Sequence, residues 1–137
     1  MTALQVHGAP EGFDALLLAR RRAETDAPVL HVARDDVRVA RLAEALAVFA
    51  PRTEVIRFPA WDCLPYDRVS PNPEIVAERV AALAQLLEPA RGKRIVLTTV
   101  NALVQRVPPP EVFRGVTMTL QKGGRVQPEA LTAFLES

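Results

Sequence analysis

Apolar and polar positions along the chain change period several times, and each change predicts a different element. Near-continuous aliphatic runs at 28–33 and 94–98 are typical of strands that are buried on both faces of a parallel sheet. Residues 53–58 alternate between apolar and polar side chains, which is also typical of a strand. Segments 13–22 and 35–50 carry apolar residues at helical spacing. This part of the chain is therefore expected to alternate between helices and strands.

Helix-capping residues and prolines predict two further helices. Asn72 is followed by Pro73, which marks a helix start with Asn as the N-cap and Pro at the first helical position. We expect that helix to continue to about Leu87. A short helix is predicted over 101–106, and the three prolines at 108–110 end it.

The alternation of strands and helices predicts an α/β fold, in which a three-layer parallel sheet carries helices on both faces. Residues 4–6 form a short apolar run and are a candidate first strand. Toward the C-terminus the pattern becomes a strand at 116–120, a turn at 122–124 and a helix that opens at 127–129.

This change of pattern predicts a domain boundary. We assign residues 1–113 to the α/β domain and residues 114–137 to the truncated beginning of a second, small α+β domain. Because the chain ends within or just after its last helix, we expect it to be a fragment.

Composition excludes several classes of protein. The chain is 49% hydrophobic and 24% charged, which is typical of a globular domain. Its net charge of +1 offers no overall basic field for nucleic acid. No apolar run is long enough to span a membrane, and the N-terminus does not resemble a signal peptide. A single cysteine cannot form an internal disulfide, which fits the cytoplasmic location that we expect.

The turn at 8–15, GAPEGFDA, lies where the first strand-to-helix turn of such a sheet usually binds phosphate. A phosphate-binding loop needs Gly, four residues, and then Gly-Lys-Ser/Thr. With that pattern registered on Gly8, Phe13 stands at the second Gly, Asp14 at the Lys and Ala15 at the hydroxyl position. The degenerate loop comprises Gly8, Gly12, Phe13, Asp14 and Ala15.

Replacement of Lys by Asp reverses the charge that a phosphate would meet, and Glu11 adds a second carboxylate. We therefore expect no cofactor at this turn. The interpretation that we favour is a turn followed by an acidic helix start, which the helix dipole stabilises.

Residues 58–78, FPAWDCLPYDRVSPNPEIVAE, form an unusual connector that holds the chain's only Trp, Tyr and Cys, with four prolines among 21 residues. Trp61 and Tyr66 could stack on nucleic-acid bases or on a partner's side chain. The interpretation that we favour is that they cover the sheet edge and fix the connector.

Three arginines, Arg34, Arg38 and Arg41, fall on one face of the second predicted helix. They could contact phosphate or an acidic partner, although a solvated helix face is the simpler interpretation. The two histidines lack neighbours at metal-ligand spacing, and no set of residues for nucleophilic catalysis can be assembled. We therefore predict neither a catalytic residue nor a metal site.

Three phrases of the sequence resemble the N-terminal region of the bacterial transcription-repair coupling factors, the Mfd family. They are FPAWDCLPYDRVSPNPEIVAERVAAL (58–83), IVLTTVNALVQRVPPP (95–110) and MTLQKGGRV (118–126). The family phrase combines Phe-Pro, Trp-Asp, Leu-Pro-Tyr-Asp and Ser-Pro with a following helix that carries an Arg, here Arg79. We include Arg79 among the possible interaction residues.

This resemblance implies a degenerate motor-like domain, similar to the first domain (domain 1a) of the DNA-repair helicase subunit UvrB, that lacks a working ATP site. It implies that the connector replaces the region from which UvrB extends its DNA-gripping hairpin. In the family, the surface that binds UvrA lies in the following domain. The full-length protein is an ATP- and Mg-dependent DNA translocase that displaces stalled RNA polymerase, whereas the motor and the polymerase-binding domain are absent here.

The resemblance thus implies a non-catalytic fragment that contributes to UvrA recruitment and to restraint of the translocase, with no membrane partner. Two alternatives remain open. A nucleotide- or phosphate-dependent enzyme of the doubly wound class would bind its ligand at the turn 8–15. A direct DNA-binding module, using the three arginines and the connector, would show salt-dependent DNA affinity.

Overall fold

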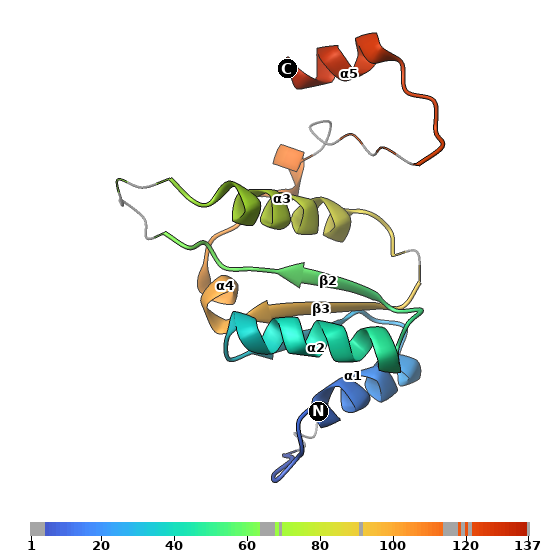
Figure 1. Cartoon of the computed structure of the whole chain (residues 1–137), viewed down its shortest axis with the longest axis vertical. Coiled ribbons are helices and arrows are strands. Elements are labelled where there is room, and N and C mark those ends of the chain that lie inside the picture. Colours follow the sequence, from blue (N-terminus) through green and yellow to red (C-terminus); the bar gives the residue numbers. More distant parts are fainter. Residues whose placement is uncertain are drawn as a thin grey trace. The chain divides into compact units, whose positions relative to one another are not determined.

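A computed structural model describes residues 5–63, 68, 70–90, 92–113, 118, 120 and 122–136. The chain divides into two compact units, residues 1–105 and residues 106–137. The first unit contains a three-stranded parallel sheet that helices flank (Figure 1). The α/β class predicted from the sequence is therefore confirmed.

The sheet has the strand order β1-β3-β2, with β1 at Val29–Ala33, β2 at Glu54–Phe58 and β3 at Arg94–Thr99. Both pairings with β3 are parallel. All six residues of the central strand β3 are buried, as its continuous aliphatic run predicts.

The helices of this unit are α1 at Phe13–Glu24, α2 at Asp36–Phe49, α3 at Pro73–Leu87 and α4 at Val100–Val104. In Figure 1, α1 and α2 lie on one side of the strands and α3 lies on the other. Alternation along β3 fits this arrangement, because Ile95 and Leu97 pack into a core cluster with α1 and α2. Members of that cluster are Ala15, Ala33, Val39, Leu42, Leu46, Ile95 and Leu97.

The strand β1 differs from its prediction, because its aliphatic run is not buried on both faces. Leu30 is 55% exposed and Val32 is 38% exposed, whereas Ala33 is buried. The physical reason is that α1 and α2 cover one face of this edge strand, whereas α3, on the other side of the sheet, packs against β2. An aliphatic run does not distinguish an edge strand from a central one.

Helix starts agree closely with the capping residues in the sequence. The Asn72 side chain accepts a hydrogen bond of 2.9 Å from the backbone N–H of Glu74, and Pro73 is the first residue of α3. At the start of α4, the Thr99 hydroxyl is the N-cap and accepts a hydrogen bond from the backbone N–H of Ala102. This helix ends at Val104, two residues earlier than predicted.

The candidate strand at 4–6 is not found in the described part of it, since Gln5 and Val6 have no strand structure, and Leu4 lies outside the described residues. Such a short run offers too few backbone groups to establish a strand without a paired neighbour.

The second unit contains a short 3-10 helix at Pro110–Phe113, a turn at 122–123 and the helix α5 at Pro128–Leu135. Gly123 has a φ of 84°, which explains a glycine in the predicted turn. The strand predicted at 116–120 lies largely outside the described residues, and the domain boundary predicted after residue 113 stays a prediction. Among the helices of the described residues, none combines the length and apolarity needed to cross a membrane.

Candidate functional site

The turn at 8–15 leads directly into α1. Gly8 and Gly12 have φ values of 67° and 85°, in the left-handed region that favours glycine. The N–H of Phe13 donates to the carbonyl of Pro10 over 3.1 Å, and Gly12 occupies the N-cap of α1. The segment is therefore a turn followed by a helix whose first turn contains the acidic residue Asp14.

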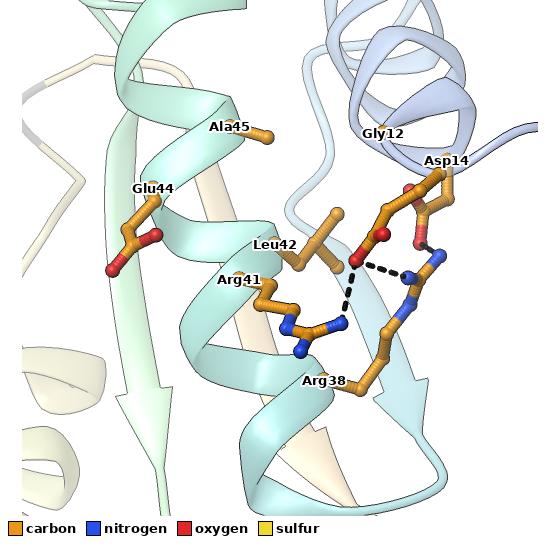
Figure 2. Close-up of a pocket in the computed structure, with 8 residues that line it drawn as sticks. Gly12, Asp14, Arg38, Arg41, Leu42, Glu44 and Ala45 are labelled. Atoms are coloured by element: carbon orange, nitrogen blue, oxygen red, sulfur yellow. Dashed lines mark hydrogen bonds and ion pairs between the residues drawn. The ribbon is translucent and has the colours of Figure 1, made fainter.

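The two carboxylates of this turn pair with two arginines of α2. Asp14 Oδ2 lies 2.7 Å from Arg38 Nη2, and Glu11 Oε1 lies 2.8 Å from Arg41 Nη1. A third contact joins Glu11 Oε1 to Arg38 Nη1 over 3.7 Å. In Figure 2, Arg38 and Arg41 extend from α2 toward the start of α1, where Asp14 lies. We call these four residues the acid–arginine network.

Solvent exposure divides the acid–arginine network into a shielded pair and an open one. The side chains of Arg38 and Asp14 are 34% and 26% exposed, whereas those of Arg41 and Glu11 are 61% and 63% exposed. The open pair contributes at most about 1 kcal/mol, because water and salt screen it. A cavity of about 360 Å³ adjoins the network and is also lined by Gly12, Leu42, Glu44 and Ala45.

This arrangement brings together residues that were singled out separately in the sequence. Asp14 belongs to the degenerate loop, and Arg38 and Arg41 belong to the basic helix face. The pairing itself was not predicted, although the acids and the arginines are each spaced three residues apart. The available signal was the spacing of Arg38 and Arg41, which places both arginines on one side of α2.

Arg34 does not join the acid–arginine network. Its side chain is 91% exposed, and its Nε donates to Asp35 Oδ2 over 2.9 Å. The Asp35 carboxylate also accepts from the backbone N–H of Arg38 as the N-cap of α2. This backbone hydrogen bond, followed by that from Arg34, lowers the pKa of Asp35 below its ordinary value.

Arg79 occupies a different environment, at the base of the connector. It is only 1% exposed, and its Cζ lies 4.3 Å from the ring centroid of Phe58 and 4.6 Å from that of Trp61. Its Nη1 donates to the carbonyl of Pro59 and, over 3.2 Å, to Oε1 of Gln105. Burial lowers the pKa of the Arg79 guanidinium.

Trp61 is partly buried and packs on Arg79, and its backbone N–H donates to Gln105 Oε1 over 2.8 Å. Its role as an interaction residue stays a prediction. Tyr66 lies outside the described residues. Within the described part of the chain, no group of three or more His, Cys, Asp or Glu side chains is placed to hold a metal ion.

Comparison with known proteins finds clear sequence relatives, although no protein-family model matches the chain. The transcription-repair-coupling factor of Escherichia coli (strain K12) is 32% identical over 123 residues, which cover 90% of this chain and 10% of that protein. That of Haemophilus influenzae is 30% identical over 126 residues, covering 92% of this chain and 11% of the relative.

The transcription-repair-coupling factor of Myxococcus xanthus is 37% identical over 124 residues, which cover 85% of this chain and 10% of the relative. The chain therefore spans about a tenth of the length of the curated relatives that it matches.

Proposed function

Because the chain belongs to the transcription-repair coupling factor family, we propose that it serves transcription-coupled DNA repair as a non-catalytic module. The activity of the whole protein, with its ATP, Mg, RNA polymerase and DNA contacts, then resides in other domains. This module contributes to recruitment of UvrA and to restraint of the translocase. Its sheet and flanking helices correspond in this proposal to the layers of the first UvrB domain.

The acid–arginine network is the observation that carries the non-catalytic part of the proposal. A phosphate at the turn 8–15 requires a cation, yet Asp14 stands at that position and binds Arg38 over 2.7 Å. At an effective dielectric constant of 20, two unit charges about 4 Å apart interact by about 4 kcal/mol. The Asp14 carboxylate would repel a triphosphate at this turn by an energy of that order. The triphosphate would also have to compete with Asp14 and Glu11 for Arg38 and Arg41.

The first test of this proposal is isothermal calorimetry with ATP and Mg²⁺. We expect no binding by the 137-residue chain at millimolar nucleotide, whereas micromolar affinity would contradict the proposal. The double substitution Glu11→Gln and Asp14→Asn serves as the matched control, because it removes both carboxylates and keeps both arginines. This variant should bind the triphosphate more tightly than the natural chain.

The second test addresses UvrA recruitment. A pull-down compares this chain with a longer version of the protein that extends beyond Ser137 and contains the complete following domain. We expect only the longer version to retain UvrA well, because the UvrA-binding surface is proposed to lie in that domain. Equal retention by both chains would place the surface within residues 1–137 and overturn this assignment.

The acid–arginine network also weighs against direct DNA binding. Arg38 and Arg41 are engaged by carboxylates, and Arg34 pairs with Asp35. If unpaired arginine or lysine side chains bound DNA phosphates, the affinity for DNA would fall steeply as the salt concentration rises. A filter-binding assay at low salt should show no DNA retention, and retention that disappears with added salt would favour the DNA-binding alternative.

A further inference from the structure

We propose that Arg79 is a positioning residue that fixes the connector and the end of the first unit through one buried guanidinium. The group involved comprises Arg79, Phe58, Pro59, Trp61 and Gln105, and we call it the Arg79 clasp. This inference goes beyond the proposed function, because it concerns how the module holds its own connector and requires no partner.

The geometry of the Arg79 clasp joins three separate segments. The guanidinium of α3 lies over the ring of Phe58, at the end of β2, and over the ring of Trp61, in the connector. Aromatic faces attract such a cation electrostatically, and they do so more strongly where water is excluded. Hydrogen bonds from Nη1 to the carbonyl of Pro59 and to Gln105 set the rotation of the planar group.

The chemistry of Arg79 is unusual for a residue that only fills space. Among the described residues it has no carboxylate partner, and its buried Nε lacks a hydrogen-bond acceptor. An unpaired buried cation is costly, and an apolar side chain of similar length would fill the same volume without that cost. What only the guanidinium supplies is a directional link among the two rings, the Pro59 carbonyl and the Gln105 amide.

Gln105 connects this link to the end of the unit. Its Oε1 accepts both from Arg79 Nη1 and from the backbone N–H of Trp61, over 3.2 and 2.8 Å. Gln105 is the C-cap of α4 and the last residue of the first compact unit. The clasp therefore fixes the start of the connector against the residue at which the chain leaves that unit.

The far end of the connector returns to the same helix. Both carboxylate oxygens of Asp62 lie 3.2 Å from the backbone N of Asn72, the N-cap residue of α3. The helix α3 thus holds the connector at Asn72 and again, two turns later, at Arg79. One helix therefore positions both the start of the connector, at Trp61, and its return, at Asn72.

Trp61 makes the proposal directly measurable, because it is the only tryptophan of the chain. The substitution Arg79→Met keeps an unbranched side chain of similar length and removes the charge and the donors. We expect the Trp61 emission to shift to longer wavelength and acrylamide to quench it more efficiently. Hydrogen exchange at the backbone N–H of Trp61 should become about tenfold faster, which corresponds to the loss of one hydrogen bond of ordinary strength.

Two further variants separate the parts of the clasp. Gln105→Leu removes the shared acceptor and leaves Arg79 in place, so it should accelerate exchange at the Trp61 N–H with a smaller change in emission. Arg79→Lys keeps the charge and loses the planar fork, and should give an emission between those of the natural chain and Arg79→Met. Emission and exchange unchanged by the lysine variant would overturn the directional role of the guanidinium.

A destabilised control excludes a general loosening of the fold. Leu46→Ala weakens the core cluster with α1 and α2, which does not include the Arg79 clasp, and should leave Trp61 emission unchanged in the folded protein. If Arg79→Met does not fold, Gln105→Leu carries the test by itself. Natural emission, quenching and Trp61 exchange in a folded Arg79→Met, or in Gln105→Leu where Arg79→Met is unfolded, would overturn the proposal.

Discussion

Arg38 shows how single residues acquire their roles from distant neighbours. Its backbone N–H donates to the Asp35 cap within the same helix, whereas its guanidinium reaches Asp14, 24 residues earlier in the chain. The first contact follows from local helix geometry, and the second depends on how α1 packs beside α2. The arginine therefore joins α2 to the start of α1. Arg34 was expected on the same helix face, but it precedes the N-cap of α2 and its side chain is solvated.

His31 gives a prediction at the scale of one residue. It lies in β1 beside Asp14 and Arg38, and partial burial, supported by Arg38 and opposed by Asp14, lowers its pKa below the ordinary value of 6.5. The unfolded chain thus takes up a proton at a higher pH than the folded chain. The free energy of unfolding should fall as the pH drops below 6.5 toward the lower folded pKa.

Urea unfolding at several pH values between 7.5 and 5 checks this expectation, with His31→Gln as the comparison. The glutamine variant lacks the titrating group, so its free energy of unfolding should depend less on pH over this window. Parallel pH profiles for the two proteins would show that His31 does not contribute.

At the scale of elements, the helices and strands of the first unit are stabilised chiefly by the faces that they bury. The helix α2 illustrates the contrast, because Leu46 is fully buried in the core cluster whereas Val48, two residues later, is 76% exposed. A helical period places these two side chains on different sides of the helix. The contribution of an apolar side chain to the free energy of unfolding should therefore depend strongly on its position along α2.

Alanine substitutions in α2 test this difference. Leu46→Ala should lower the free energy of unfolding by about 2–5 kcal/mol, because it removes buried methyl groups and leaves a cavity. Val48→Ala should change it by less than about 0.5 kcal/mol, since the valine is exposed and alanine is a good helix former. Chemical denaturation monitored by circular dichroism measures both free energies. Equal losses for the two variants would contradict the assignment of Leu46 to the buried face of α2 and Val48 to the exposed face.

At the scale of the whole molecule, the buried hydrophobic residues of the described part of the chain lie within residues 1–105, except for Phe113. The sheet, its three flanking helices and the core cluster all belong to this first unit. The described residues of the second unit include a short 3-10 helix and α5, in which Leu135 is 74% exposed. Stability of the two units is therefore expected to be unequal.

A truncation after Gln105 tests whether the first unit folds independently. The 105-residue chain should unfold cooperatively, with a Tm within about 8 °C of the full chain, the shift expected for a loss of roughly 1 kcal/mol. Differential scanning calorimetry provides the measurement. A truncated chain that shows no cooperative transition would mean that residues 106–137 are needed to complete the core.

Local sequence signals were sufficient for several elements of this protein. Asn72 and Pro73 predicted the start of α3, and the aliphatic run of β3 predicted a strand buried on both faces. These signals act through backbone propensity, side-chain caps and hydrophobic period, which involve residues within a few positions of one another. The alternation of such elements was also enough to predict a parallel sheet.

Tertiary structure alone decided which strand lies at the edge, which charges pair and which arginine is buried. Leu30 is exposed because α3 packs against β2 and leaves that face of β1 open, and Arg41 contacts Glu11 across 30 residues of chain. The family phrase singled out Arg79 in the sequence, but only the folded structure places its guanidinium over the rings of Phe58 and Trp61 and removes it from water. These contacts join residues that are far apart in the sequence, where hydrophobic periodicity and capping residues give no information. They are determined by how the elements pack against one another.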